Sequence, residues 1–130
     1  MMPKTIAEKL LIKPEEALSL VGAGPDERTV LGELPDGVVE VAPADAAVSV
    51  TFVRTRDELL ARFGSELPAL SGARAVWFLY PKGGRADVNR DTIIREAGAF
   101  GWRPISNVAI DDVWSAVRVR PLADGEASIG

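Results

Sequence analysis

The chain has 130 residues, of which 47% are hydrophobic and 26% are charged, and its net charge is −4. This balance predicts one globular domain with a sizeable core, and the negative charge disfavours a non-specific binder of nucleic acid or of an anionic membrane. The sequence has no cysteine and no histidine, which excludes disulfides, thiol nucleophiles, Ser-His-Asp triads, imidazole catalysis and the usual zinc sites.

Apolar residues at helical or strand spacing, punctuated by capping residues, prolines and glycines, define the predicted elements. The first is a short helix with a capping box at Thr5 and Glu8, which Pro14 ends. A strand over 16–22, a helix over 26–34 capped by Asp26, and strands over 38–41 and 48–53 follow. Next come a helix over 56–67 capped by Thr55, a strand over 74–80, a helix between Asn89 and Gly101, and strands over 105–110 and 113–120. In the helix after Asn89, the residues expected to face inward are Ile93, Ile94, Ala97 and Phe100.

The strand at 16–22 is nearly all apolar apart from Ser19, which is typical of a parallel sheet covered on both faces. The strand at 74–80 is also expected to be buried. The last two strands have no helix between them, so they predict an antiparallel hairpin. We therefore expect an α/β fold with a three-layer, Rossmann-like, mostly parallel sheet and a C-terminal antiparallel hairpin. The short link between the second and third strands leaves open whether they are antiparallel neighbours or joined by an extended crossover.

We expect residues 1–121 to form the domain and residues 122–130 to form a flexible tail, because the last residues are small, polar and rich in glycine. No signal peptide and no membrane-spanning run is recognisable in the sequence. We therefore expect a cytoplasmic protein without a membrane partner.

A candidate anion site follows the strand at 74–80. A basic, glycine-containing loop leads from this strand into a helix, and backbone N–H groups of such a turn and of a helix N-terminus attract anions. Open α/β sheets bind ligands at the carboxyl ends of their strands, and cationic side chains there can clamp a phosphate or carboxylate. The alternative is a solvated loop with an ordinary helix cap. The residues expected to bind the ligand are Tyr80, Lys82, Gly83, Gly84, Asn89 and Arg90.

A second candidate is the pair Asp111-Asp112 between the last two strands. Two adjacent carboxylates can bind a hard cation or take part in acid–base chemistry. The alternative is a turn in which aspartate accepts backbone hydrogen bonds, with Trp114 anchored in the core. We favour the turn and predict no metal site.

The order of the elements, with a glycine turn after the first strand, resembles the class I S-adenosylmethionine-dependent methyltransferase fold over most of the chain, with about one strand–helix unit missing. The resemblance implies S-adenosylmethionine as a cofactor, with Gly22 and Gly24 in the glycine motif and Glu40 as a candidate for the ribose hydroxyls. The motif differs from the family pattern, since residues 19–21 include no acidic residue and Asp26 stands at the third glycine position. The turn alone is also explained by glycine's tolerance of positive φ.

Three segments also resemble a family of small bacterial proteins that has no established activity. They are A-E-K-L-x-I-K-P at 7–14, Y-P-K at 80–82 with N-R-D at 89–91, and D-D-V-W-S-A-V-R-V-R-P at 111–121. This resemblance implies a fold but no mechanism.

Three functional hypotheses follow. The leading one is a non-catalytic module, without a cofactor, that binds a small anionic ligand or a protein partner near Tyr80. The second is a divergent S-adenosylmethionine-dependent methyltransferase whose substrate lies near Tyr80-Pro81. The third is a structural domain that forms a homodimer through an exposed sheet edge.

Overall fold

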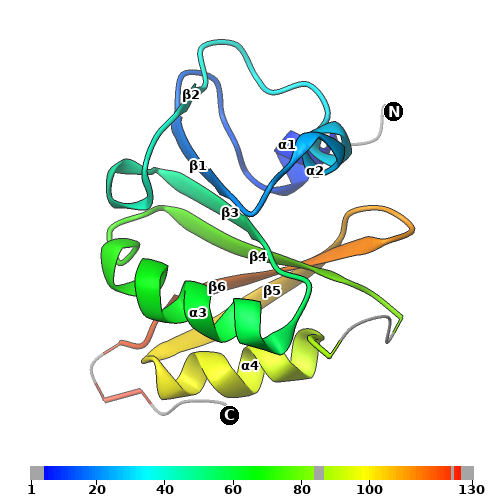
Figure 1. The fold of residues 1–130 in the computed structure, drawn as a ribbon. Helices are drawn as coiled ribbons and strands as arrows, with labels where there is room; N and C mark the ends of the chain where they lie inside the picture. Colours follow the sequence, from blue (N-terminus) through cyan, green and yellow to red (C-terminus); the bar gives the residue numbers. More distant parts are fainter. Residues whose placement is uncertain (1–4, 84–86, 124, 127–130) are drawn as a thin grey trace.

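The structure is a computed structural model that describes residues 5–83, 87–123 and 125–126. Gly84, one of the expected ligand residues, lies outside the described residues. The elements are shown in Figure 1. In chain order they are α1 (Ile6–Lys9), β1 (Ala17–Val21), α2 (Pro25–Leu31), β2 (Val39–Glu40), the 3₁₀ turn η1 (Pro43–Asp45), β3 (Val48–Phe52), α3 (Arg56–Glu66), the 3₁₀ turn η2 (Leu67–Ala69), β4 (Ala75–Pro81), α4 (Arg90–Ala99), β5 (Trp102–Ala109) and β6 (Trp114–Pro121).

The centre of the molecule is a six-stranded sheet in the order β2-β1-β3-β4-β6-β5. The first four strands in this order are parallel, whereas β6 is antiparallel to both β4 and β5. The predicted Rossmann-like sheet with a C-terminal antiparallel hairpin is therefore confirmed. The carboxyl ends of β1, β3 and β4 lie along one edge of the sheet, next to the start of β6, where Pro81 is paired with Trp114.

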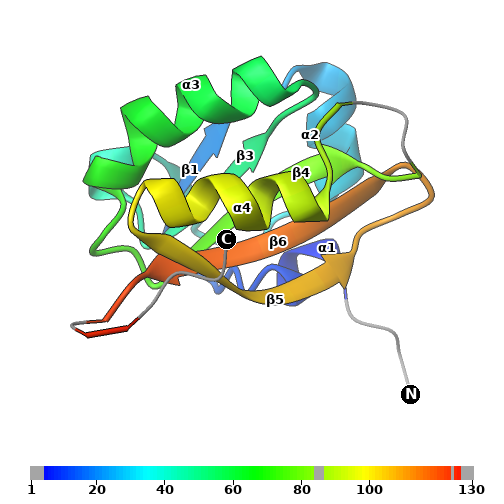
Figure 2. The same ribbon diagram turned by 90° about the horizontal axis from the view of Figure 1, so that it is seen from below.

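Helices cover both faces of this sheet, with α1 and α2 on one side and α3 and α4 on the other (Figures 1 and 2). Side chains of β4 alternate between the two faces, as a strand requires. Trp77 and Leu79 pack in the core under α1 and α2, and Val76, Phe78 and Tyr80 pack in the core under α3 and α4. All five are buried, which explains why this strand has no polar face in the sequence.

The link between β2 and β3 is an extended crossover. Both strands are parallel to β1 and lie on opposite sides of it. The crossover needs no helix because β2 has only two residues, which pair with Ala17 and Leu18 at the start of β1. The chain then makes the single turn η1, and Ala47 N donates to the carbonyl of Ala17 (2.9 Å). The antiparallel alternative is thus wrong.

The predicted helices form, with two corrections at their ends. The second helix begins at Pro25 with Gly24 as its N-cap, so the prediction of Asp26 as N-cap is wrong; proline fits the first helical position because its missing N–H has no partner there. In α4, Ile93 and Ala97 are buried as expected, but Ile94 is only partly buried and Phe100 is 39% exposed. Phe100 instead lies edge-on against Phe63, with 5.5 Å between ring centroids.

The short helix α1 has the predicted capping box at Thr5 and Glu8. It ends well before Pro14 because Leu11 adopts a left-handed conformation (φ 65°). Ile12 N donates to the carbonyl of Ala7 (2.9 Å), which is the pattern that closes a helix end. Leucine at this position is strained, since a side chain disfavours positive φ.

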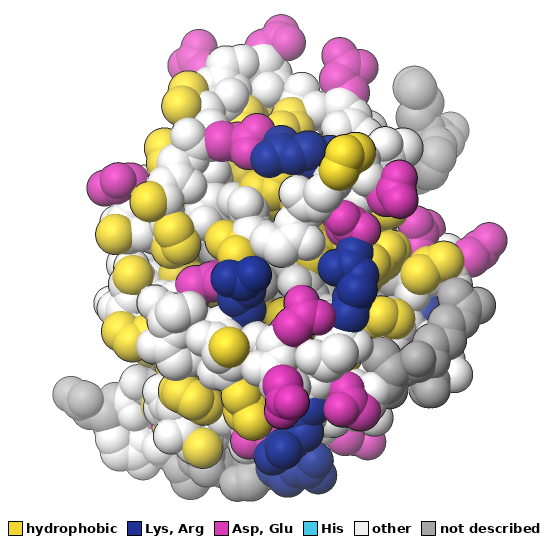
Figure 3. Space-filling model, viewed as in Figure 1, with side chains coloured by type: hydrophobic (Ala, Val, Ile, Leu, Met, Phe, Trp, Pro, Cys, Tyr) yellow, Lys and Arg dark blue, Asp and Glu magenta, His cyan; other side chains and the backbone are white. Residues whose placement is uncertain are grey.

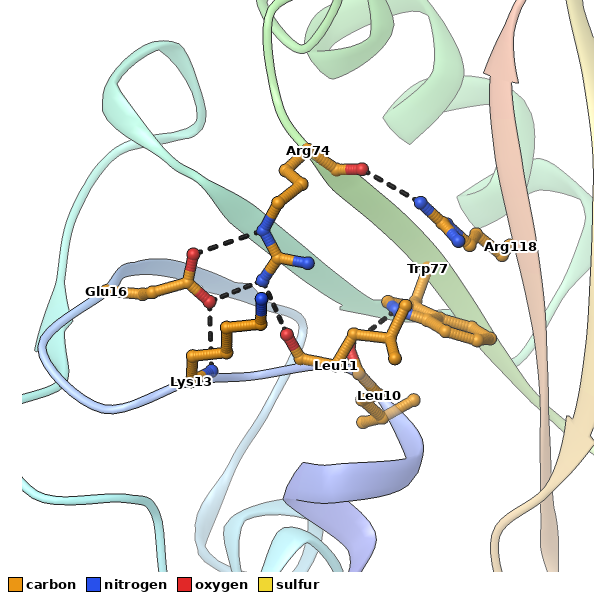
Figure 4. A network of polar contacts seen from close by, with 7 residues as sticks. All are labelled: Leu10, Leu11, Lys13, Glu16, Arg74, Trp77 and Arg118. Carbon is orange, nitrogen blue, oxygen red and sulfur yellow. Dashed lines mark hydrogen bonds and ion pairs between the residues drawn. The ribbon is translucent and has the colours of Figure 1, made fainter.

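A polar network fastens the end of α1 to the sheet (Figure 4). Trp77 Nε1 donates to the carbonyl of Leu10 (2.8 Å), and Arg74 Nη2 donates to the carbonyl of Leu11 (2.6 Å). Arg74 also forms an ion pair with Glu16. Burial would raise the pKa of the Glu16 carboxyl, but the hydrogen bonds and charges of Arg74 and Lys13 together outweigh burial and lower that pKa.

The hairpin between β5 and β6 turns at Asp111, as predicted. Its Oδ1 accepts hydrogen bonds from the backbone N–H groups of Val113 (2.8 Å) and Trp114 (2.7 Å), so this aspartate is explained by the turn. No salt bridge is formed by Asp111 or Asp112 within the part of the chain that the structure describes.

Beyond β6, Glu126 contacts two arginines of the hairpin, Arg103 (2.6 Å) and Arg120 (2.7 Å). The hydrogen bond from Arg120 is the main cause that lowers the pKa of Glu126 to about 2. The flexibility of residues 122–130 stays a prediction. Among the described residues, no helix is long and apolar enough to cross a membrane.

Candidate functional site

A shallow pocket of ≈ 310 Å³ opens at the carboxyl end of β4. Tyr80–Gly83 and Asn89–Asp91 line it. Five of the residues expected to bind an anion therefore surround one opening: Tyr80, Lys82, Gly83, Asn89 and Arg90. We call this opening the β4 pocket.

Tyr80 lines the β4 pocket and is only 6% exposed. Its hydroxyl accepts a hydrogen bond from Asn107 Nδ2 (3.3 Å), and the same nitrogen donates to the carbonyl of Ala116 (2.9 Å). Sequence reasoning missed Asn107, because its approach to Tyr80 depends on how β5 and β6 align beside β4. No local pattern in the sequence encodes that alignment.

Among the described residues that line the β4 pocket, the charged ones are two cations and one carboxylate. Lys82 is held at the pocket by its backbone N–H, which donates to the carbonyl of Val113 (2.8 Å). Arg90 Nε lies 3.8 Å from Asp91 Oδ1, and the two side chains are 59% and 80% exposed. An ion pair this long and this exposed stabilises little, so the Arg90 guanidinium can turn toward an incoming anion.

Asn89 serves as the helix cap. Its Oδ1 accepts hydrogen bonds from the backbone N–H of Thr92 (2.9 Å) and from the Thr92 hydroxyl (3.1 Å). The nearby Asp87 caps another helix start, since its Oδ1 accepts from the backbone N–H of Arg56 (2.8 Å). The N-terminus of α4 thus lies at the pocket with its side-chain cap in place.

The glycine turn after β1 lies at the same edge of the sheet, on the other side of β3. Gly22 has φ 74°, and a Cβ added there would lie 2.5 Å from the carbonyl oxygen of Phe52. Both facts require glycine whether or not a ligand binds, because the turn passes directly against the end of β3.

Glu27 is hydrogen-bonded to the Gly24 N–H, the backbone group of this turn that a ligand would be expected to use. Its Oε1 accepts a hydrogen bond from Gly24 N (2.7 Å), and its other oxygen pairs with Arg54. Arg54 in turn lies over the Trp114 ring, 5.2 Å from its centroid. The bond from Gly24 is the main cause that lowers the pKa of Glu27. Sequence reasoning missed Glu27, although a glutamate three residues after an N-cap is the signal of such a bond.

Glu40 is the last residue of β2 and lies at the carboxyl end of that strand. Arg28 holds its carboxylate with two hydrogen bonds of 2.8 and 2.9 Å, and these lower the pKa of Glu40. Both side chains remain about half exposed, at 48% and 46%. The carboxylate is therefore oriented but still open to solvent.

A buried polar cluster lies beneath α3 and was not predicted. The Thr51 hydroxyl donates to Glu66 Oε1 (2.8 Å), and Glu66 is 4% exposed. Ser19 and Ser49 pair across β1 and β3, and within the described residues their hydroxyls and Glu66 Oε2 have no hydrogen-bond partner. Burial raises the pKa of Glu66, against the opposing effects of Thr51 and Arg62.

Other parts of the molecule offer less chemistry. A larger groove of ≈ 750 Å³ lies between α1 and the loop after α2, lined mainly by apolar side chains, away from the carboxyl ends of the strands. The described residues include no cluster of three or more possible metal ligands. On the face drawn in Figure 3, basic side chains lie next to acidic ones, so this face has no extended basic patch.

The two edge strands of the sheet are poorly suited to pairing with a second copy of the chain, as the predicted homodimer would require. The edge strand β5 contains Pro104 and an irregularity between Pro104 and Ser106, and the opposite edge strand β2 has two residues. Proline, bulges and short strands are features that protect an edge from pairing with another chain. A homodimer stays a prediction, and these features disfavour the sheet edges as its interface.

Comparison with known proteins places the fold among methyltransferases. No protein-family model and no curated protein matches the sequence. Solved structures that are similar include a protein of the NADB-Rossmann superfamily from Streptococcus agalactiae (TM-score 0.58, 8% identity, 93% of this chain and 69% of that chain), a proposed tRNA (m1A22) methyltransferase from Streptococcus pneumoniae (0.54, 11%, 92% and 71%), and the ribosomal protein L11 methylase of Lactobacillus delbrueckii subsp. bulgaricus (0.53, 11%, 89% and 74%).

These identities are too low to transfer an activity, and the similarity is one of fold. Membership of the family of small bacterial proteins stays a prediction. The chain thus has a Rossmann-like fold of the kind found in methyltransferases.

Proposed function

We propose that this protein is a ligand-binding domain that takes a small anion, a phosphate or a carboxylate, in the β4 pocket. The proposal rests on one observation: Lys82, Gly83 and the start of α4 line the same opening at the carboxyl end of a central strand. This is where open α/β sheets bind ligands.

The local charges support an anion. Lys82 and Arg90 lie at the pocket with Asp91 as the opposing carboxylate among its lining residues. The backbone N–H groups at the start of α4 add partial positive charge. An arginine and a lysine beside a helix N-terminus can form several charge-assisted hydrogen bonds to one anion.

The test is a phosphate and sulfate titration followed by amide chemical shifts. We expect saturable shifts at Lys82, Gly83 and residues 89–91, which the double variant Lys82→Ala/Arg90→Ala abolishes. Arg95→Ala is the matched control, because Arg95 lies on the same helix with a similarly exposed side chain (64%) and does not line the pocket. Equal titrations for the wild type and the double variant would refute the proposal.

A second candidate is binding of S-adenosylmethionine by a divergent methyltransferase. Its support is the methyltransferase fold of the similar structures together with Glu40 at the end of β2, where the resemblance implies a contact with ribose hydroxyls. The bond from Gly24 to Glu27 weighs against it, because that amide is already engaged.

A thermal-shift measurement with S-adenosylmethionine and S-adenosylhomocysteine separates the two candidates. A ligand at a hundred times its Kd stabilises the native state by about 2.7 kcal/mol. Stabilisation of that size, lost in Glu40→Ala, would favour the methyltransferase. An unchanged Tm at millimolar ligand would leave the anion-binding domain as the better account.

A further inference from the structure

A second pocket adjoins the β4 pocket. It has a volume of ≈ 230 Å³ and lies between α4 and the C-terminal hairpin, lined by Arg90 and Ile94 of α4, residues 104–107 of β5, and Val117 of β6. We call it the α4–β5 pocket. Among the residues that the structure describes, its lining includes one cation, Arg90, and no acidic residue, so the described wall beyond Arg90 is apolar or neutral.

Arg90 belongs to both pockets. Ile94 lies four residues after Arg90 on α4, and residues at this spacing occupy the same face of a helix. The two linings are also in contact, because the Tyr80 hydroxyl of the first accepts a hydrogen bond from Asn107 of the second (3.3 Å). A ligand held by Arg90 can therefore extend along α4 from one pocket into the other.

Ile105 is the residue that gives the second pocket its apolar character at the surface. The register of β5 shifts between Pro104 and Ser106, which leaves Ile105 outside the regular pairing with β6. Such a bulge redirects a side chain and is common beside functional sites. Ile105 is 41% exposed, and it lies with Ile94, Pro104 and Val117 in one depression.

We infer that the ligand is an amphipathic organic anion whose charged group lies in the β4 pocket and whose short apolar tail lies in the α4–β5 pocket. This inference rests on the proposed anion site. Two observations support the inference. Arg90 lines both pockets, and the described lining of the second pocket has no acidic residue. A free inorganic anion would leave the apolar pocket, with Ile105 at its surface, without an occupant.

The experiment compares methyl phosphate with butyl phosphate by isothermal titration calorimetry and amide chemical shifts. Each buried methylene strengthens binding about fourfold, so the three added methylenes should lower Kd by at least about tenfold even when they are only partly buried. The added shifts should fall on Ile94, Ile105 and Val117.

Two variants locate the tail. Ile105→Ser should remove most of the gain for butyl phosphate and leave the Kd of methyl phosphate unchanged. Val39→Ser is the control, because Val39 is an exposed valine (60%) on β2, at the opposite edge of the sheet, and lines neither pocket. The control should keep the full gain.

The outcomes separate this inference from the proposed function. Equal Kd values for methyl and butyl phosphate, with shifts at the β4 pocket, would overturn the amphipathic ligand and leave the anion site standing. A gain for butyl phosphate that survives Ile105→Ser would place the tail elsewhere and would also overturn the inference. No binding of either phosphate ester would overturn both.

Discussion

Replacing Gly22 by alanine is expected to destabilise the fold strongly, for reasons that involve no ligand. Gly22 has φ 74°, a conformation that costs an L-residue about 1–2 kcal/mol. The new Cβ would lie 2.5 Å from the Phe52 carbonyl oxygen, and real Cβ contacts below 3.0 Å are essentially never seen. The end of β3 must move, which disturbs the bond from Val53 N to the Leu79 carbonyl (2.9 Å).

Overpacking of this kind adds about 1–3 kcal/mol, so Gly22→Ala should lower the free energy of unfolding by roughly 2–5 kcal/mol in total. The control is Gly101→Ala. Gly101 has nearly the same backbone conformation (φ 80°) and nothing within 4 Å of an added Cβ, so it should lose only the conformational part, about 1–2 kcal/mol.

Urea unfolding followed by tryptophan fluorescence measures both losses, provided that the m-value is unchanged. The expected difference of a few kcal/mol corresponds to a difference in Tm of roughly 4 °C per kcal/mol for a domain of this size. Equal losses in the two variants would refute the argument that Gly22 is required by its approach to β3. Gly22 would then be explained by its positive φ alone.

Three further predictions concern stability. Because burial raises the folded-state pKa of Glu66 above the ordinary 4.5, the native state holds a proton that the unfolded state releases, and stability falls as pH rises from 4.5 through the folded pKa. Glutamine does not titrate, so the Glu66→Gln variant should not lose stability over this pH range. In urea titrations between pH 4 and pH 8, its free energy of unfolding should rise relative to that of the wild type, by about 1.4 kcal/mol for each unit that separates the folded and unfolded pKa of Glu66. A difference between the two proteins that does not depend on pH would contradict this. Trp77→Phe should lower the free energy of unfolding by about 1–3 kcal/mol, in addition to the loss from the smaller ring, because the buried carbonyl of Leu10 loses its hydrogen-bond donor. A thermal unfolding curve like that of the wild type would contradict this. Asp111→Ala should cost about 1 kcal/mol through two lost hydrogen bonds, whereas Asp112→Ala, whose side chain makes no hydrogen bond among the described residues, should be nearly neutral by the same measurement.

Local chemistry explains what could be predicted of the fold. Thr5, Thr55 and Asn89 each cap a helix with their side chains, as their sequence context indicates. The apolar run of β4 and the missing helix before β6 were enough to predict a buried parallel strand and a hairpin. Each of these signals involves only a few neighbouring residues, so it can be recognised in the sequence without knowledge of the tertiary structure.

What escaped prediction depends on contacts between distant parts of the chain. The pairing of Arg54 with Glu27, the burial of Glu66 beside Thr51 and the bond from Asn107 to Tyr80 each join two elements. Their partners become neighbours only when the strand order and register are set. The direction of the crossover from β2 to β3 was left open for a related reason, because the sequence does not show that β2 has only two residues and pairs with the start of β1.

The fastening of α1 to the sheet has a consequence for the order in which the protein assembles during synthesis. A four-residue helix has no stability of its own, and the groups that hold the carbonyls of Leu10 and Leu11 are the side chains of Trp77 and Arg74, which lie 67 and 63 residues later in the chain. Helix α1 is therefore synthesised before the residues that hold it in place, and it cannot dock until β4 has been made.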